Sequence, residues 1–395
     1  MTESGAVDRH ASWLELFFDL VVVVAVAQLA HLLHGDAHHG PGGMDIITFF
    51  TLYLAIWLVW TAFTLYSNVV ADRVRVRAMF LGMAGIATMA AAVPHSMDGR
   101  ANLFAAAYLI TTAIGVNAFQ RSGMVLLTWT AASQNAGLVP WVVSFWVGNP
   151  WWKLGLWLFG IALTMFASVL MSRGDHEEML TRLNERLAKR AERQPRGSKE
   201  PGWTALVAAR LDAGHLGERF GLFVIIVLGE AMLQLVGAVA AIEDWRPGGG
   251  EGWLLLLTVV SAFLLLITLW GLNVRHAFAE ETHFPPALLL PAHFVVIASI
   301  TTVAAGLGAA AAGSADHLNP SSTWLMCGGV SAFLLVVNLL VTHTRLWPVR
   351  AVAVLLPLVV AVVAPWLPAA VIVTVLAVAA GGQLMSLFAV SRSDK

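Results

Sequence analysis

Apolar runs of about twenty residues recur along almost the whole chain, and each is long enough to cross the hydrocarbon core of a bilayer as a helix. Backbone amide and carbonyl groups cannot stay unpaired in lipid, so such runs fold as membrane-spanning helices. The sequence predicts twelve of them, although the last two could instead form one re-entrant pair. The expected spans are 13–34, 44–66, 77–94, 101–118, 124–147, 151–171, 216–241, 252–274, 287–312, 322–343, 349–366 and 368–390.

The composition agrees with an all-α, polytopic integral membrane protein. Hydrophobic residues make up 58% of the chain and charged residues 12%, whereas about a quarter of a soluble domain is charged. The net charge of −1 offers no overall basic footprint for nucleic acid, which is not expected as a partner. The single cysteine, Cys327, excludes an internal disulfide. No motif indicates a cofactor, a hydrolase or a kinase, so the expected partners are the lipid bilayer and a small molecule or ion.

The distribution of cations predicts the orientation in the membrane. Short loops rich in Lys and Arg stay on the cytoplasmic side. With the N-terminus inside, 19 of the 23 Lys and Arg residues fall on the cytoplasmic side and three on the other. Both termini and the linker 172–215 are therefore expected in the cytoplasm.

The chain divides into an N-terminal six-helix half (1–171), a charged cytoplasmic linker (172–215) and a C-terminal six-helix half (216–395). Within the linker, residues 172–202 predict a charged helix followed by a flexible connection, and residues 203–216 predict an amphipathic helix at the membrane surface. A faint internal repeat favours a 6+6 arrangement. Glu15-x-Phe17 opens the first span and Glu218-x-Phe220 opens the seventh, and at the same offset His31 corresponds to Gln234.

Charged side chains inside the hydrocarbon cost about 2.5 to 3.5 kcal/mol each, so the few present are candidates for function. Asp19 on the first span and Glu230 on the seventh are the two most costly, and they are expected to point inward as a cation- or proton-binding pair or as two gating acids. The alternative is that both acids only fix helix packing through Arg219 or backbone donors.

Further polar residues near these acids complete the candidate ion or substrate pathway, and each has a structural alternative. Glu15 and Glu218 could be membrane-edge anchors or partners of Arg219, and Asn68 with Asp72 could mark only a helix exit. His293 is either an interhelical donor or a proton relay. The full set is Asp19, Glu230, Glu15, Gln28, His293, Asn68, Asp72, Glu218 and Gln234.

The first outer loop is rich in residues that can bind zinc, copper or nickel. These residues are His31, His34, Asp36, His38 and His39. Their spacing fits no defined metal motif, and loop histidines beside glycines are also common polar filler. A metal site is therefore the less favoured interpretation.

Several motifs resemble the low temperature requirement A (LtrA) family of bacterial membrane proteins. They are WLELFFDLV at 13–21 with Gln28 beyond it, YSN at 66–68 with Asp72, ERFGLF at 218–223 continuing to Glu230, and AH at 292–293. After Trp270 the family has an aromatic-aspartate pair where this chain has Gly271-Leu272-Asn273, which puts any charge relay through that helix in doubt. The resemblance implies a polytopic inner-membrane protein linked by name to growth in the cold, and it brings no settled biochemical activity.

Two main classes of function follow. A secondary transporter coupled to protons or cations is favoured, because 6+6 topology and sparse buried carboxylates are typical of such proteins. An ion channel is the alternative, because Phe18-Asp19 before a Val-rich helix resembles the repeat openings of lysosomal potassium channels. A membrane-embedded sensor or enzyme is a third possibility, supported only by the outer histidine cluster. The sequence indicates neither the substrate nor an oligomeric state.

Overall fold

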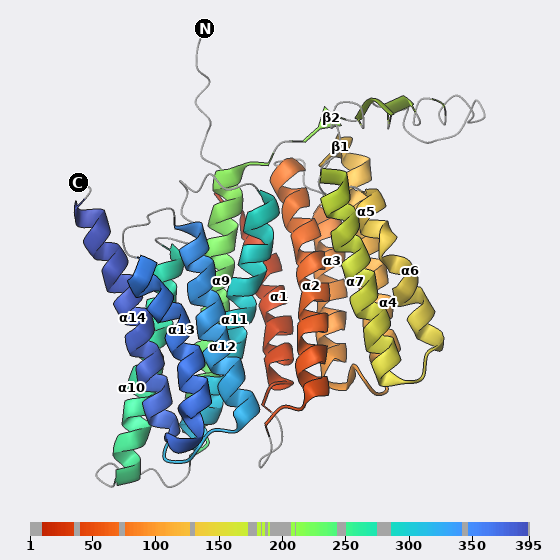
Figure 1. The fold of residues 1–395 in the computed structure, drawn as a ribbon. Helices are drawn as coiled ribbons and strands as arrows, with labels where there is room; N and C mark the ends of the chain where they lie inside the picture. The colour runs from red at the N-terminus through yellow and green to blue at the C-terminus, as the bar shows by residue number, and fades with distance from the viewer. Residues whose placement is uncertain are drawn as a thin grey trace. The chain divides into compact units, whose positions relative to one another are not determined.

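The fold is a set of long apolar helices, which confirms the all-α polytopic prediction (Figure 1). The computed structural model describes residues 10–34, 40–70, 76–126, 131–172, 180–182, 184–185, 189, 207–209, 211–242, 250–274, 286–341 and 347–393. Eleven helices in this part of the chain are long and apolar enough to cross a membrane. They are α1 (Trp13–His31), α2 (Gly43–Val70), α3 (Val76–Ala92), α4 (Ala101–Ser122), α7 (Pro150–Ser172), α9 (Ala213–Ala240), α10 (Gly250–Leu272), α11 (Pro286–Ala312), α12 (Pro320–Leu340), α13 (Trp347–Val363) and α14 (Ala369–Ser393).

The predicted fifth span, 124–147, is not one helix. It contains β1 (Met124–Val125), α5 (Ala131–Ala136), α6 (Leu138–Val143) and the 3-10 turn η3 (Ser144–Trp146). Pro140 explains the break, because it has no amide hydrogen to donate to the carbonyl four residues earlier, at Ala136, where α5 ends. At the other end of the chain, α13 continues through η5 (Ala364–Trp366) to form one candidate span, Trp347–Trp366, and α14 forms a separate one.

The predicted surface helix at 203–216 is wrong at 207–209, whereas the described residues 213–216 are helical as the first turn of α9 (Ala213–Ala240). Val207 and Ala208 form a short strand, β2, that pairs in parallel with β1. The Val207 amide donates to the Gly123 carbonyl at 3.0 Å, and the Ala209 amide donates to the Val125 carbonyl at 2.9 Å. This backbone pairing satisfies groups that an amphipathic helix would have paired internally. The charged helix predicted for 172–202 lies mostly outside the described residues.

Contacts divide the chain into two compact units. Unit 1 contains residues 1–11, 23–53 and 217–395, and unit 2 contains residues 12–22 and 54–216. Helices α1, α2 and α9 therefore each contribute to both units. The predicted halves 1–171 and 216–395, and the repeat between them, stay predictions.

Unit 2 is held together by aromatic stacking and by glycine contacts. The rings of Trp141 and Trp157 stack at 4.9 Å with an 8° angle between their planes, and Tyr108 stacks on Trp141 at 4.1 Å. The Trp157 indole nitrogen donates to the Ser144 hydroxyl at 2.9 Å. These contacts pack α6 and η3 against α4 and α7.

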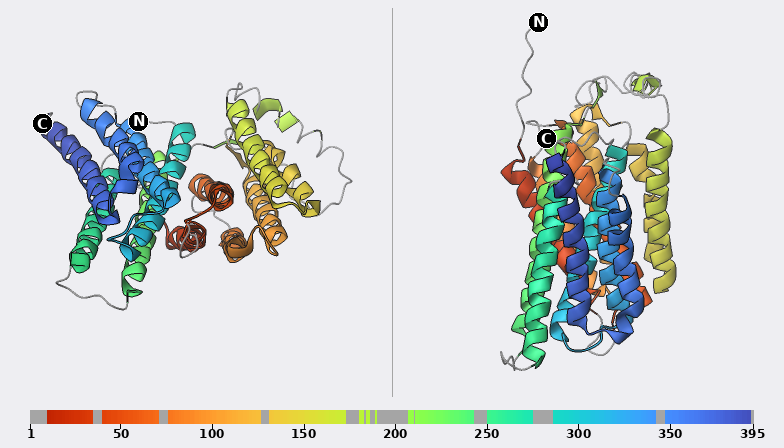
Figure 2. Two further views of the ribbon diagram at one scale, coloured as in Figure 1. Left: turned by 60° about the horizontal axis from the view of Figure 1, so that its bottom comes forward. Right: turned by 60° about the vertical axis from the view of Figure 1, so that its left-hand side comes forward.

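In unit 1, α10 packs on α14, α11 packs on α12, and α13 lies between α12 and α14 (Figures 1 and 2). Small residues allow the close approach of α11 and α12, as is common between membrane helices. A β-carbon added at Gly329 of α12 would lie 2.9 Å from the Ser299 carbonyl oxygen of α11. The first part of α2 joins this unit, where the Tyr53 hydroxyl lies 3.2 Å from the Thr301 hydroxyl.

Candidate functional site

The candidate residues gather in two polar sites, one within each unit. The site in unit 2 is built around the buried acid Glu15, in the first turn of α1. Ser12 donates to one oxygen of its carboxylate through its backbone amide at 2.9 Å and its hydroxyl at 2.8 Å, and the Glu15 amide returns to the Ser12 hydroxyl at 3.4 Å. This reciprocal arrangement is a capping box, which fixes the start of the helix and the position of the carboxylate.

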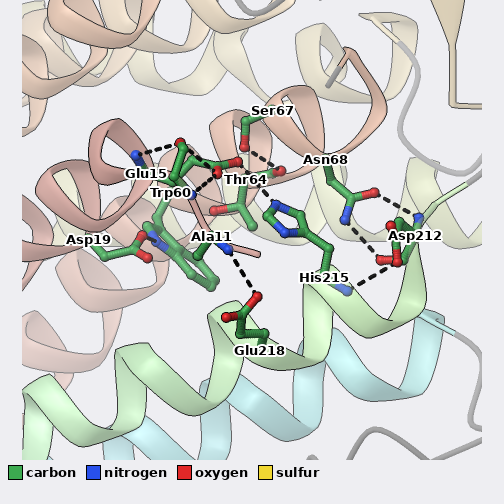
Figure 3. Close-up of polar contacts among 11 residues, drawn as sticks. Ala11, Glu15, Asp19, Trp60, Thr64, Ser67, Asn68, Asp212, His215 and Glu218 are labelled. Carbon is green, nitrogen blue, oxygen red and sulfur yellow. Dashed lines mark hydrogen bonds and ion pairs between the residues drawn. The ribbon is translucent and has the colours of Figure 1, made fainter. Parts of the chain in front are cut away.

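The second carboxylate oxygen of Glu15 faces a histidine. The Nε2 atom of His215, on α9, lies 3.2 Å from Oε1 of Glu15 (Figure 3). Glu15 is 1% exposed and His215 is 2% exposed. Away from water a contact between a carboxylate and an imidazole is stronger than at the surface, so this pair ties the start of α1 to the start of α9.

Asp19, one turn further along α1, is fully buried and interacts with α2. The Trp60 indole nitrogen donates to its carboxylate at 2.6 Å. Beside this pair, the rings of Phe18 and Phe63 lie 5.4 Å apart and fill the same helix interface. The Asp19 side chain is thus buried against α2, where the Trp60 indole donates a hydrogen bond to it.

Asn68 binds the backbone that leads into α9. Its amide nitrogen donates to the Asp212 carbonyl and its amide oxygen accepts from the Asp212 amide, both at 2.9 Å. The side chain of Asp212 in turn accepts from the His215 amide at 3.1 Å, as an N-cap does. Asn68 therefore positions the helix start that carries His215 (Figure 3).

Glu218 belongs to unit 1 and binds the N-terminal segment. Its carboxylate accepts from the Ala11 amide at 2.9 Å and lies 3.4 Å from Nδ1 of His10. It follows His215 by one helical turn along α9, so neighbouring turns of this helix hold two acid-histidine contacts.

The second polar site is a cavity of about 770 Å³ in unit 1, here called the Glu230 cavity. Glu230 and Gln234 line it from successive turns of α9, and the Gln234 amide donates to the Glu230 carboxylate at 3.3 Å. Its other lining residues are His31, His34, Gly40, Leu233, Gly237, Ala238, Gly308, Ala309, Ala312, Gly313, Asp316, His317, Leu318, Asn319 and Ser322. Two acids and three histidines thus line this cavity. Its described lining residues include no Lys or Arg.

His34 at this cavity lies just beyond the end of α1. Burial, and after it the neighbouring His31, lower the pKa of His34 below its ordinary value of 6.5, while hydrogen bonds to the backbone of Ala30 and His31 act in the opposite direction. The two rings lie 5.2 Å apart. The neutral form of His34 is therefore favoured at the cavity.

Other predicted residues are placed differently. His293 is fully buried and stacks on Phe220 at 4.4 Å with the edge of Phe223 at 5.5 Å, as a packed aromatic residue does. Gln28 is half-buried on α1. Asp72, Asp36, His38 and His39 lie outside the described residues. Among the residues with described placements, no group of three or more potential ligands could hold a metal ion. Asp19 and Glu230 belong to different units, so their predicted pairing stays a prediction.

Sequence reasoning does not identify two partners of the candidate acids or two further residues of the Glu230 cavity. His215 lies in the predicted linker and Trp60 in the predicted second span, yet they contact Glu15 and Asp19. Asp316 and His317 lie in the loop between α11 and α12 and join the Glu230 cavity only in three dimensions. The Ser12-x-x-Glu15 pattern was the one readable signal, because it marks a helix start.

The apolar helices and the buried ionisable residues define a multi-pass α-helical membrane protein. The chain belongs to the family described as bacterial low temperature requirement A protein (LtrA), whose model matches residues 10–384. An uncharacterized protein of Rhizobium meliloti (strain 1021) is 25% identical over 351 residues, covering 77% of this chain and 73% of the relative. No solved structure matches the chain. The family resemblance seen in the sequence is thereby confirmed.

Proposed function

We propose that this LtrA-family protein is a secondary transporter that couples the movement of a small molecule or ion to protons or cations across the bacterial cytoplasmic membrane. The observation that carries this proposal is Glu230, an acid on a membrane-crossing helix that lines a polar cavity of about 770 Å³. Ionisable residues within membrane helices are costly and mark ion or substrate pathways.

The chemistry of the Glu230 cavity favours a cation over an anion. Glu230 and Asp316 supply negative charge, Gln234 and Asn319 supply neutral oxygen atoms, and the pKa of His34 favours its uncharged form. A concave surface with one sign of charge and apolar walls concentrates ions of the opposite sign. The volume also lies within the range of small-molecule sites.

The orientation expected from the cation distribution gives this cavity a side. The C-terminal part of α9 and the loop between α11 and α12 would then face away from the cytoplasm. In this view the Glu230 cavity is an outward-facing vestibule from which a cation or substrate enters.

The buried acids of unit 2 support proton coupling. Glu15 and His215 form an acid-histidine pair that is withdrawn from water, and Asp19 lies one turn further along α1. A proton that binds such a pair changes its charge where the dielectric constant is low, which biases helix positions strongly. Secondary transporters use such changes to alternate access.

Electrical recording on proteoliposomes tests the proposal. Purified protein is reconstituted and adsorbed on a solid-supported membrane, and sudden steps of proton, Na⁺ or K⁺ concentration are applied from the predicted outer side. We expect a transient charge movement in the wild type and its loss in Glu230→Gln, which keeps the shape but removes the titratable charge.

Asp98→Asn is the matched control, because Asp98 is an exposed acid in another predicted outer loop and lies outside the Glu230 cavity. Its charge movement should equal that of the wild type. Wild-type charge movement in Glu230→Gln would contradict the proposed role of the cavity. Sustained single-channel currents in a planar bilayer would replace the transporter with an ion channel.

A further inference from the structure

Arg350, in the first turn of α13, is a buried cation that the proposed transport function does not use. The residue is 6% exposed. Its Nε and Nη2 atoms are buried and have no hydrogen-bond partner among the residues that the structure describes. Two buried donors of a charged group without partners are costly, so an anion that accepts from them would be strongly favoured.

A cavity of about 440 Å³ adjoins this guanidinium. It lies between the end of α12 and the start of α13, which pack against each other. Asn338 is its other polar residue. The Asn338 oxygen accepts from Gln383 at 2.9 Å, whereas its amide nitrogen has only long contacts of 3.5 Å, to the Arg350 carbonyl and to Gln383. The cavity therefore offers hydrogen-bond donors and no carboxylate.

The remaining wall of the cavity is apolar and exposed. Leu335 is 47% exposed, Trp347 is 69% exposed and Leu355 is 56% exposed, and all three line it. On a membrane-spanning helix, exposed leucines face acyl chains, and an exposed tryptophan near a helix end is typical of the headgroup region. The occupant must thus combine an anionic group with hydrocarbon.

We infer that this cavity binds the headgroup of an anionic phospholipid, with the phosphodiester on the Arg350 guanidinium and the acyl chains along Leu335 and Leu355. Planar guanidinium groups bind phosphate oxygens through two parallel hydrogen bonds. The cation distribution predicts that this end of α12 and α13 faces the cytoplasm, and basic pockets between helices on that side are typical headgroup sites. A zwitterionic headgroup would bring a second cation toward Arg350, so a net negative lipid is preferred.

Native mass spectrometry of the detergent-solubilised full chain tests this inference with three probes. These are phosphatidylglycerol, phosphatidylcholine of the same acyl chains, and inorganic phosphate. We expect the wild type to retain phosphatidylglycerol over phosphatidylcholine, and Arg350→Gln to retain it about tenfold less, the loss expected for removing one charge-assisted pair. Lys189→Gln is the control, because Lys189 is an exposed cation on the same predicted side, and it should retain lipid as the wild type does.

Each other outcome decides the matter. Equal retention of the two lipids by the wild type, or an equal loss in Lys189→Gln, would show general surface attraction and overturn the site. Release of phosphatidylglycerol by inorganic phosphate at matched concentration would assign the site to a free anion and overturn the lipid. If Arg350→Gln does not fold, Arg350→Lys serves instead, since it keeps the charge, loses the planar pair of donors and should retain an intermediate amount of lipid; wild-type retention in Arg350→Lys would overturn the inference.

Discussion

The buried acids of α1 have hydrogen-bond donors that differ in kind. Asp19 accepts from an indole, which stays a donor whatever the charge of the carboxyl group. Glu15 accepts from a serine and contacts a histidine, which changes between donor and acceptor with its protonation. The Trp60 contact of Asp19 therefore has a fixed donor, whereas the donor in the contact of Glu15 with His215 depends on the histidine tautomer.

The hydrogen bond between Trp60 and Asp19 should be a measurable part of the stability of unit 2. In Trp60→Phe the Asp19 carboxyl group loses a donor at 2.6 Å while fully buried, which should lower the free energy of unfolding by about 1 to 3 kcal/mol. Thermal unfolding in detergent measures the change. A double-mutant cycle with Asp19→Ala separates this bond from lost packing. An equal cost of Trp60→Phe in both backgrounds would contradict the assignment.

His34 should make the protein less stable in acid. Its pKa is below 6.5 in the folded protein, so the unfolded chain takes up the proton at a higher pH than the folded one. Protonation of His34 therefore does not reduce the free energy of unfolding above about pH 6.5, and it reduces it as the pH falls from about 6.5 toward the lower pKa of the folded protein. Unfolding temperatures measured from about pH 7.5 to about pH 5 should fall less in His34→Gln than in the wild type. Identical pH profiles would show that burial of His34 has no consequence.

At the residue scale the sequence predicts which acids are costly but not what they contact. Asp19 and Glu15 are visible as acids in an apolar run, and both are buried. Their partners are separated from them by 41 and 200 residues, and long-range contacts leave no local pattern. The surroundings of His293 are equally invisible in sequence: it lies between two phenylalanine rings, and its predicted role as a donor or a proton relay stays a prediction.

Helices in this protein approach one another through glycine, and the contact between α5–α6 and α7 is the clearest case. Gly137, between α5 and α6, faces Gly160 of α7. A β-carbon on Gly160 would lie 2.6 Å from the Gly137 carbonyl oxygen, and one on Gly137 would overlap the Gly160 carbonyl oxygen and the Thr164 hydroxyl. Backbone atoms cannot move aside as a flexible side chain can, so this interface requires both glycines.

Gly137→Ala should separate α5 and α6 from α7. The added methyl group overlaps backbone, and such overpacking lowers the free energy of unfolding by about 1 to 3 kcal/mol or more. Gly155→Ala is the matched control on α7, because nothing lies within 4 Å of its added β-carbon. Thermal unfolding in detergent should place Gly155→Ala within about 0.5 kcal/mol of the wild type or above it. Equal melting temperatures of the two variants would contradict the close contact.

The positions of the elements follow closely from the sequence wherever one apolar run forms one helix. Eleven predicted spans correspond to eleven long helices, because the length of an apolar run and the thickness of a bilayer fix both ends. Two segments differ. In 124–147 the apolar run is continuous but Pro140 interrupts the helix, and at Val207 and Ala208 pairing with β1 replaces the helix predicted for 203–216. Hydropathy predicts neither the helix break at Pro140 nor the pairing of the two short strands.

The orientation of the whole molecule is a prediction that cysteine labelling can test. Cys327 is buried and can be replaced by alanine to give a background without cysteines. In that background a cysteine at Asp98 should react with an impermeant maleimide added to intact cells, and a cysteine at Lys189 should react only after the membrane is opened. Labelling at position 189 from outside would reverse the predicted topology.

Unit 1 is built from segments on both sides of the linker, and this limits where two related genes could recombine. Unit 1 takes residues 23–53 from before the linker and residues 217–395 from after it. Recombination between two related genes within the linker would leave unit 2 almost entirely from one parent, but it would assemble unit 1 from both. Tyr53 of one parent would then have to fit the Thr301 hydroxyl of the other. The polar linker looks in sequence like a suitable place for a crossover, but a crossover there would divide the packing of unit 1. The segments before and after the linker are therefore expected to be inherited together.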